Sequence, residues 1–346
     1  EKMVELSNGC ICCTLREDLL EEVKKLAAEG KYDYLVIEST GISEPLPVAT
    51  TFEFRDENGE SLADVAFIDN MITVVDAVNF LSNYSSTQYL KNTSESLGDD
   101  DERAIIDLMV EQIEFASTIV LNKVSDCAPQ DLATIKSVIK GLNTDAQLVE
   151  ADYSNVPMDK VINTRLFDLE KAQKHPLWSK ELYDFKNHTP ETDEFGITSF
   201  VYRAKLPFYP EKFMRFINEV EWPGIIRAKG FFWLSTRPDY IGEVSQAGSL
   251  IRHQGIGVWW CAVDKNQWPQ GDEFQAVLSK HWDQKSGDRR QEIVFIGLKD
   301  QIDQEAICAG LDQCLVHDYW DDPLGYQCVS DPFPNWFKEQ VEAESA

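Results

Sequence analysis

The stretch Ser117-Thr-Ile-Val-Leu-Asn-Lys-Val-Ser-Asp126 places an apolar run directly before two polar residues, Asn122 and Lys123. A short, continuous apolar run is typical of a strand that is buried on both faces of a parallel sheet. The carboxyl end of such a strand lies at the edge where open α/β sheets bind their ligands. The stretch therefore predicts a buried strand over 117–121 and a binding role for the residues that follow it.

Strand and helix signals alternate on both sides of this stretch. Further apolar runs predict strands at Tyr34–Ile37, Met71–Asp76 and Ala146–Val149, and apolar residues at helical spacing predict helices at 14–28, 102–116 and 130–140. Strands that alternate with helices indicate a parallel sheet with helices on both faces. The first half of the chain is therefore expected to have an α/β fold.

The second half differs in composition and pattern. Eight of the nine tryptophans lie at or after Trp222. Strand-like segments at Ile197–Tyr202 and Glu292–Ile296, with a predicted helix at 304–315, indicate a smaller α+β domain. We expect a first domain at 1–173, a polar linker at 174–193, a second domain at 194–330 and a tail at 331–346.

The charge balance excludes one class of partner. The 346 residues include 32 Lys and Arg against 60 Asp and Glu, which gives a net charge of −28. Nucleic-acid binding needs a basic face, so no nucleic-acid partner is expected. No run approaches the roughly 18–20 apolar residues of a membrane span, and the first residues are not a signal peptide. These observations predict a cytoplasmic protein that does not enter the membrane.

Three of the eight cysteines crowd into Asn8-Gly9-Cys10-Ile11-Cys12-Cys13, directly before a predicted helix. Thiolates are the metal-binding form of cysteine, and the dipole at a helix N-terminus favours them. Sulfur ligands suit Zn(II) or Cu(I), and three protein ligands leave one zinc position open for an exchangeable ligand. The cluster predicts a metal or redox site at Cys10, Cys12 and Cys13, with three buried structural cysteines as the alternative.

Two acids follow predicted strands. Glu38 ends the run Tyr34–Ile37, and Gly41 stands three residues later. In nucleotide hydrolases a strand-terminal acid organises Mg²⁺ and water, and glycine lets a backbone N–H approach the terminal phosphate. Asp76 either faces a nucleotide or caps the next turn, the commoner role for an acid at such a junction.

Asn122 and Lys123 are candidates for base recognition. GTPases select guanine with an Asn-Lys pair followed by an acid, which accepts hydrogen bonds from the base N1–H and 2-amino group. The usual spacing is Asn-Lys-x-Asp, whereas this chain has Ser125 at the acid's position and Asp126 one residue later. Asp126 is therefore the candidate acid, provided that the loop bulges to bring it to the base.

In this order and spacing, the signals resemble the CobW-like branch of the CobW/HypB/UreG P-loop GTPases over nearly the whole chain. Gly9–Cys13 is similar to the CxCC metal motif of that family, Glu38–Gly41 to its Walker B and switch segment, and Asn122-Lys123 to its guanine motif. Trp222–Trp233 and Gly287–Ile296 resemble segments of its C-terminal domain.

The resemblance implies a P-loop GTPase domain followed by a CobW C-terminal domain, acting together as a GTP-dependent zinc metallochaperone. Cys10, Cys12 and Cys13 would hold Zn(II), and GTP with Mg(II) would bind at the sheet edge. Glu38 would organise the magnesium shell or the attacking water, and Gly41 would sense the γ-phosphate. Binding and hydrolysis would reorder the cysteine segment and release zinc to a client metalloenzyme.

The phosphate-binding loop of such proteins, G-x-x-x-x-G-K-S/T, occurs nowhere in the sequence. In the family it precedes the CxCC motif, so we expect an opening strand–loop–helix unit before residue 1 in the complete gene product.

Three alternatives stay open. One is a metal sensor or storage module without productive GTPase activity, and another is a cysteine redox switch, since clustered thiols of low pKa oxidise readily. The third is the same machinery serving cobalt or iron. The client and homo-oligomer formation also stay open.

Overall fold

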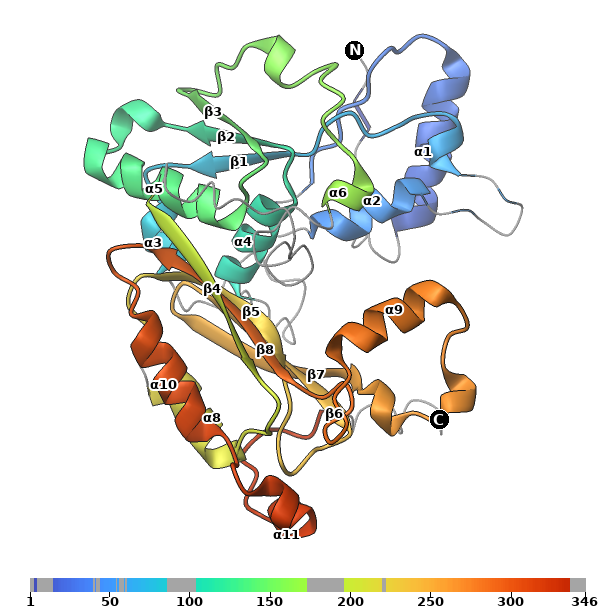
Figure 1. Ribbon diagram of the computed structural model, residues 1–346. Helices are drawn as coiled ribbons and strands as arrows, with labels where there is room; N and C mark the ends of the chain where they lie inside the picture. Colours follow the sequence, from blue (N-terminus) through green and yellow to red (C-terminus); the bar gives the residue numbers. More distant parts are fainter. Residues whose placement is uncertain are drawn as a thin grey trace. The chain divides into compact units, whose positions relative to one another are not determined.

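The computed structural model forms two compact units, residues 1–177 and 178–346, which are described separately (Figure 1). The structure describes residues 3–4, 15–39, 41, 44–53, 55, 59, 61–85, 104–172, 196–219 and 222–336. Among these residues, no helix combines the length and the apolar character that crossing a bilayer would require.

The first unit contains a parallel three-stranded sheet in the order β1-β2-β3. These strands span Ile72–Asp76, Thr118–Asn122 and Gln147–Ala151, so the strands predicted at 71–76, 117–121 and 146–149 are confirmed. The central strand β2 is buried along its apolar length, as its sequence predicts. Edge strand β1 exposes Ile72 and Val74.

Helices connect the strands and pack beside them. The α-helices of this unit are α1 (Leu15–Glu29), α2 (Pro45–Glu53), α3 (Phe80–Tyr84), α4 (Ile105–Phe115), α5 (Pro129–Leu142) and α6 (Leu169–Ala172). Short 3-10 turns lie at η1 (Leu62–Asp64), η3 (Val124–Asp126) and η4 (Met158–Lys160). Helices α1, α4 and α5 confirm the predicted helices, and α4 and α5 each bury an apolar face.

The prediction of a buried strand at Tyr34–Ile37 is wrong. Residues 31–39 carry no strand assignment, and 41% of Leu35 and 76% of Val36 are exposed. Ile37 instead packs against a small cluster formed by α1, α2 and η1. An apolar run becomes a parallel strand only where a neighbouring strand supplies backbone partners, and the described residues provide none here.

The second unit is built on an antiparallel five-stranded sheet in the order β4-β8-β5-β6-β7. Its strands are β4 (Ile197–Ala204), β5 (Ile225–Phe232), β6 (Tyr240–Ala247), β7 (Leu250–Val258) and β8 (Gln291–Leu298). The remaining elements are α8 (Pro210–Glu219), η6 (Trp260–Ala262), η7 (Lys265–Gln267), α9 (Asp272–His281), α10 (Gln304–Cys314), η8 (Tyr319–Asp321) and α11 (Pro323–Gln327). The α+β prediction, with strands at 197–202 and 292–296 and a helix at 304–315, is confirmed.

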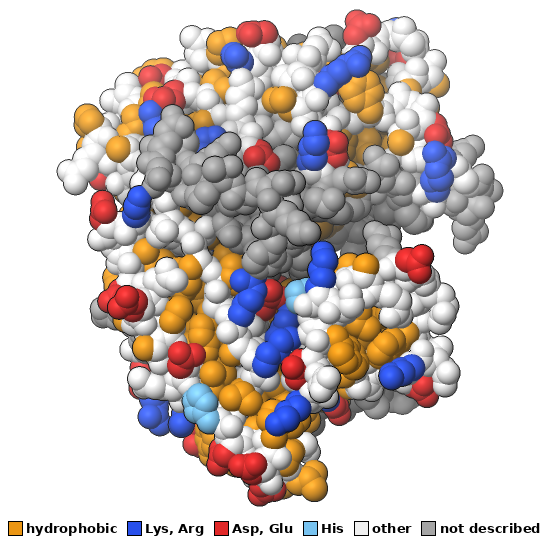
Figure 2. All heavy atoms as spheres, in the orientation of Figure 1, with side chains coloured by type: hydrophobic (Ala, Val, Ile, Leu, Met, Phe, Trp, Pro, Cys, Tyr) orange, Lys and Arg blue, Asp and Glu red, His pale blue; other side chains and the backbone are white. Residues whose placement is uncertain are grey.

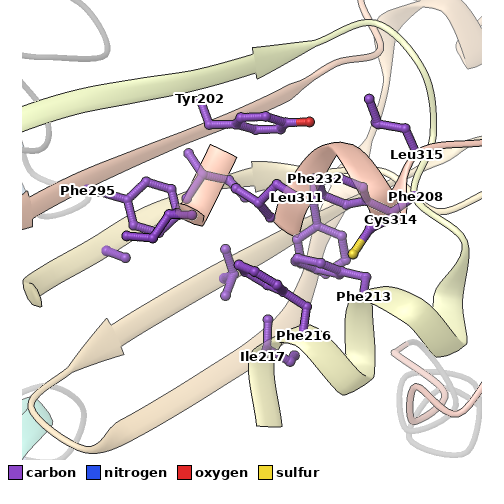
Figure 3. Packing of buried hydrophobic residues seen from close by; sticks show 14 of the residues in the cluster. Tyr202, Phe208, Phe213, Phe216, Ile217, Phe232, Phe295, Leu311, Cys314 and Leu315 are labelled. Carbon is purple, nitrogen blue, oxygen red and sulfur yellow. The ribbon is translucent and has the colours of Figure 1, made fainter. Parts of the chain in front are cut away.

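Helices α8 and α10 pack together against one face of this sheet around an aromatic core (Figures 1 and 3). The ring centroids of Phe208 and Phe213 are 4.4 Å apart, and those of Phe213 and Phe232 are 4.9 Å apart. Aromatic contacts of this kind add to the free energy gained by burying apolar area. Two tryptophans of this unit, Trp233 and Trp259, are core residues, since they are at most 2% exposed.

Lys and Arg side chains gather on the face of the second unit that Figure 2 shows, although the chain is acidic. One buried acid in this unit, Glu292, pairs with Arg203 Nε at 3.0 Å and with Arg290 Nε at 2.6 Å. Burial opposes ionisation, but these guanidinium groups hold the pKa of Glu292 below its ordinary value. The buried charge is therefore compensated, as a folded core requires.

Gly230 allows β5 to approach β8 closely. A Cβ atom at this position would lie 2.1 Å from the backbone oxygen of Glu292, and backbone cannot swing away as a side chain can. The glycine within the segment Trp222–Trp233 is therefore required by the contact between two neighbouring strands.

Replacing Gly230 by Ala should lower the free energy of unfolding of the second unit by about 1–3 kcal/mol, the usual cost of overpacking a core. Denaturant unfolding followed by tryptophan fluorescence measures this change, because Trp233 and Trp259 are buried in the same unit. Gly41→Ala, in the first unit, is the comparison variant, since a Cβ atom there meets no described atom within 4 Å. Equal stability of the two variants would contradict the packing argument.

Candidate functional site

The carboxyl ends of the three parallel strands lie in register. Asp76 at the end of β1 pairs with Asn122 at the end of β2, which pairs with Ala151 at the end of β3. The backbone N–H of Ala77 also donates to the carbonyl of Asn122 at 3.0 Å. A polar residue stands at the end of β1 and of β2, and another directly follows β3, so the edge has the placement of a ligand-binding crevice in an open α/β sheet.

Lys123 is held by Asp76 across this edge. Its ammonium lies 2.7 Å from Asp76 Oδ2, and its backbone is left-handed, with φ of 63°. Asp76 also accepts hydrogen bonds from Val78 N at 3.0 Å and from Asn79 Nδ2 at 2.8 Å. Burial raises the pKa of Asp76, but the bonds from Lys123 and Asn79 outweigh it and hold the pKa below its ordinary value. Asp76 therefore caps the following turn and also positions Lys123.

Asn122 joins the loop after β2 to the loop after β3. Its Nδ2 donates to Ser154 Oγ at 3.1 Å, and the backbone N–H of Ser154 donates to Asn122 Oδ1 at 2.9 Å. Tyr153 and Ser154 both have left-handed backbone, with φ of 53° and 56°, and the Tyr153 side chain is exposed. Left-handed backbone at residues other than glycine is uncommon and gathers at functional sites.

Asp126 lies at the end of the 3-10 turn η3 and is exposed. Its backbone N–H donates to the carbonyl of Lys123 at 3.2 Å, which closes the turn. Ser125, which stands at the usual position of the guanine-binding acid, donates from both its backbone N–H and its hydroxyl to Asp152 Oδ1, each at 2.9 Å. The sequence pattern does not identify Asp152 and Ser154. Their only signal in the sequence is that they follow a predicted strand, whose predicted end at Val149 lies two residues before the end of β3.

Glu38 and Gly41 lie on a separate segment. Glu38 is exposed, and no described hydrogen bond or ion pair connects it to Asn122 or Lys123. The carbonyl of Gly41 accepts a hydrogen bond from Gln112 Nε2 at 2.9 Å, and the carbonyl of Gln112 accepts one from Thr73 Oγ1 on β1 at 2.8 Å. These bonds connect Gly41 through α4 to the sheet.

The three predicted metal ligands, Cys10, Cys12 and Cys13, lie outside the described residues. Within the described part of the chain, no group of three or more His, Cys, Asp or Glu side chains is placed to hold a metal ion. Burial raises the pKa of Cys261 and of Cys314 to about 11, which disfavours the thiolate that binds metals. These two cysteines are packing residues.

Tyr34 fixes the segment that leads to Glu38. Its hydroxyl donates to Asp69 Oδ2 at 2.5 Å, and Asp69 also accepts from the backbone N–H groups of Thr164 at 3.1 Å and Arg165 at 2.6 Å. Burial, followed by the bond to Asp69, raises the pKa of Tyr34 to about 12. Burial opposes ionisation of Asp69, but the bonds from Tyr34, Arg165 and Thr164 hold its pKa below the ordinary value. The bond is therefore intact across neutral pH.

Comparison with known proteins identifies the family. Residues 1–150 match the family described as CobW/HypB/UreG, nucleotide-binding domain, and residues 197–315 match the cobalamin synthesis protein cobW C-terminal domain. The chain is 43% identical, over 92% of its length, to the zinc-regulated GTPase metalloprotein activator 1 of Dictyostelium discoideum, and the alignment covers 67% of that relative. The chain therefore belongs to the CobW/HypB/UreG family, in the branch that carries a CobW C-terminal domain.

Two further proteins are similar over most of the chain. A protein of Mycobacterium tuberculosis named as a zinc chaperone is 25% identical over 97% of this chain and 80% of its own length. The crystal structure of Zn(II)-bound YjiA GTPase from E. coli aligns with 88% of this chain and 78% of its own, at 18% identity and a TM-score of 0.35. The expected fold class is confirmed: a parallel nucleotide-binding sheet precedes a smaller α+β domain.

Tyr34→Phe should lower the free energy of unfolding of the first unit by about 1 kcal/mol, below the roughly 1.5–3 kcal/mol of a hydrogen bond to a buried charged group, because Tyr34 is partly exposed. The effect should be full between the ordinary pKa values of Asp, 3.8, and Tyr, 10.0. It should shrink as pH rises toward about 12 and the hydroxyl ionises, and as pH falls below 3.8 and Asp69 gains a proton.

Hydrogen exchange at the amides of Thr164 and Arg165, which share Asp69 with Tyr34, gives the local measurement. Exchange should be faster in Tyr34→Phe. The exposed neighbour Tyr32 provides the matched control, Tyr32→Phe. Identical exchange in the two variants would contradict a role for Tyr34 as an anchor.

Proposed function

We propose that this protein acts as a GTP-dependent zinc metallochaperone. The observation that carries the proposal is the likeness, over 92% of the chain, to a protein named as a zinc-regulated GTPase metalloprotein activator. The aligned strand ends and the Asn-Lys pair support it, because the carboxyl ends of parallel strands are where open α/β sheets bind their ligands. The first domain, 1–173, would bind nucleotide. The second, 194–330, which the linker 174–193 joins to it, would contact the client.

In this proposal, guanine binds beside Asn122 and Lys123. The Asn122–Ser154 bonds hold the two loops together before the ligand arrives, so less free energy is spent on ordering them. The carboxylate that the base requires would come from Asp126 in η3, as the sequence predicts, or from Asp152, which directly follows β3. The Lys123 side chain extends toward Asp76, so its ammonium lies at the same edge of the sheet.

Glu38 and Gly41 would act on the phosphate side. Glu38 would organise the magnesium shell or the attacking water, and GTP would be hydrolysed to GDP and phosphate. Gly41 would sense the γ-phosphate through its backbone. Its hydrogen bond to Gln112 connects Gly41 to α4 and, through Thr73, to β1. A shift of Glu38 and Gly41 would therefore change the contacts of α4 with the sheet.

Cys10, Cys12 and Cys13 would carry Zn(II) as cargo. Three thiolates suit zinc, and an open fourth position suits an ion that is to be handed on. One helix, α1, separates the cysteines from the segment that ends at Glu38. A nucleotide-dependent shift of that segment would therefore change zinc affinity and favour transfer to a client metalloenzyme. The reducing cytoplasm would keep the thiols available.

A competitive Zn(II) titration of the full-length protein tests the proposal. We expect tight, equimolar binding that is lost in Cys12→Ser and kept in Cys328→Ser, whose cysteine is exposed and outside the motif. Mg·GTP should shift zinc affinity by about 5- to 150-fold, the usual range of coupling between two sites, whereas Mg·GDP and Mg·ATP should not.

Other results of the titration would favour other functions. Zinc affinity that no nucleotide changes would indicate a sensor or storage module. Thiols that oxidise in place of binding zinc would indicate a redox switch, and tighter binding of cobalt or iron would change the cargo.

A further inference from the structure

The acid that reads guanine is missing from its usual place in the chain. Guanine presents two neighbouring donors, N1–H and the 2-amino group, and a carboxylate accepts both. Ser125 stands where the acid is expected, and its hydroxyl cannot accept both hydrogen bonds with a full negative charge. If GTP binds at this edge, as proposed above, another side chain must supply the carboxylate.

Asp152 brings a carboxylate to the side chain of Ser125. Asp152 Oδ1 accepts hydrogen bonds from Ser125 N and from Ser125 Oγ, both at 2.9 Å. The negative charge therefore lies within one hydrogen bond of the position that an acid at residue 125 would occupy. A carboxylate has about four lone-pair sites, two on each oxygen, so the two bonds to Oδ1 leave both sites of Oδ2 available for a ligand.

Asp126 points elsewhere. Val124–Asp126 form the 3-10 turn η3, in which successive side chains are about 120° apart around the axis. The side chain of Asp126 is therefore turned away from that of Ser125, and bringing it to the same place would require opening the turn closed by Asp126 N and Lys123 O.

The loop that carries Asp152 is fixed in advance. Residue 152 comes directly after Ala151, the register partner of Asn122, just as Lys123 comes directly after Asn122. The Asn122–Ser154 bonds and the bond from Asn155 N to the carbonyl of Asp152, 3.0 Å, hold the loop on both sides of Tyr153. Left-handed backbone at Tyr153 and Ser154 completes this turn. A carboxylate held by such a loop is preorganised for recognition.

We propose that Asp152, positioned by Ser125, is the residue that reads the guanine base. It accepts the hydrogen bonds of N1–H and the 2-amino group, and Asp126 takes no part. The inference rests on the proposed function, because it assigns the specificity of the same nucleotide site.

Asp152→Asn tests the proposal without removing the link between the loops. The amide oxygen of Asn can still accept from Ser125, while the amide nitrogen becomes a donor where the second carboxylate oxygen was. That donor opposes the 2-amino group of guanine but matches the 2-oxo group of xanthine. We expect GTP affinity of the full-length protein to fall roughly 10- to 100-fold and XTP affinity to rise, measured by competition with a fluorescent guanine nucleotide.

Two comparison variants make the result specific. Asp159→Asn removes one exposed acid from the turn η4 and should leave both affinities unchanged. Asp126→Asn should affect GTP binding far less than Asp152→Asn. A switch to XTP in Asp126→Asn, with none in Asp152→Asn, would overturn the proposal while leaving a guanine-specific protein.

A rescue experiment separates base recognition from a role in loop structure. Asp152→Ala should lose guanine selectivity, and adding Ser125→Asp should restore it, because the carboxylate then stands at residue 125 itself. Failure of the second change to restore selectivity would overturn the assignment. A wild-type protein that binds GTP no better than ATP would overturn both this inference and the guanine dependence of the proposed function.

Discussion

The parallel, in-register pairing of β1, β2 and β3 is the constraint on which the first unit depends. Because Asp76, Asn122 and Ala151 are register partners, the residues that follow them emerge side by side. The ion pair between Lys123 and Asp76, and the bonds from Asn122 and Ser125 to the loop after β3, all require this alignment. A slip of one residue in β2 would turn Asn122 to the other face of the sheet and separate every one of these pairs.

Much of this arrangement can be predicted from local sequence. The buried strand β2 follows from the continuous apolar run before Asn122, and α4 and α5 follow from their apolar spacing. Asn122 and Lys123 stand out because their residue types and their place at a strand end carry the signal. The strand predicted at Tyr34–Ile37 fails because an apolar run does not say whether a neighbouring strand is present to pair with it.

The pairing of Ser125 with Asp152 could not be predicted in the same way. The two residues are 27 positions apart, and neither has an unusual neighbourhood in the sequence. Their contact follows from the order of strands in the sheet and from left-handed backbone at Tyr153 and Ser154. Glycine is the usual sequence signal for that conformation, and neither position has one. Local patterns reveal the ends of strands, whereas contacts between the loops that follow depend on tertiary structure.

The ion pair of Lys123 with Asp76 bears on which ligands this edge binds. The Lys123 ammonium already has a carboxylate at 2.7 Å. It therefore binds a small anion such as free phosphate weakly, because that anion would replace one charge contact with another. A larger ligand, touching several groups along the strand ends, can share or displace the pair and still bind with a net gain. The pair therefore favours ligands that make several contacts along the strand ends over small anions that make one.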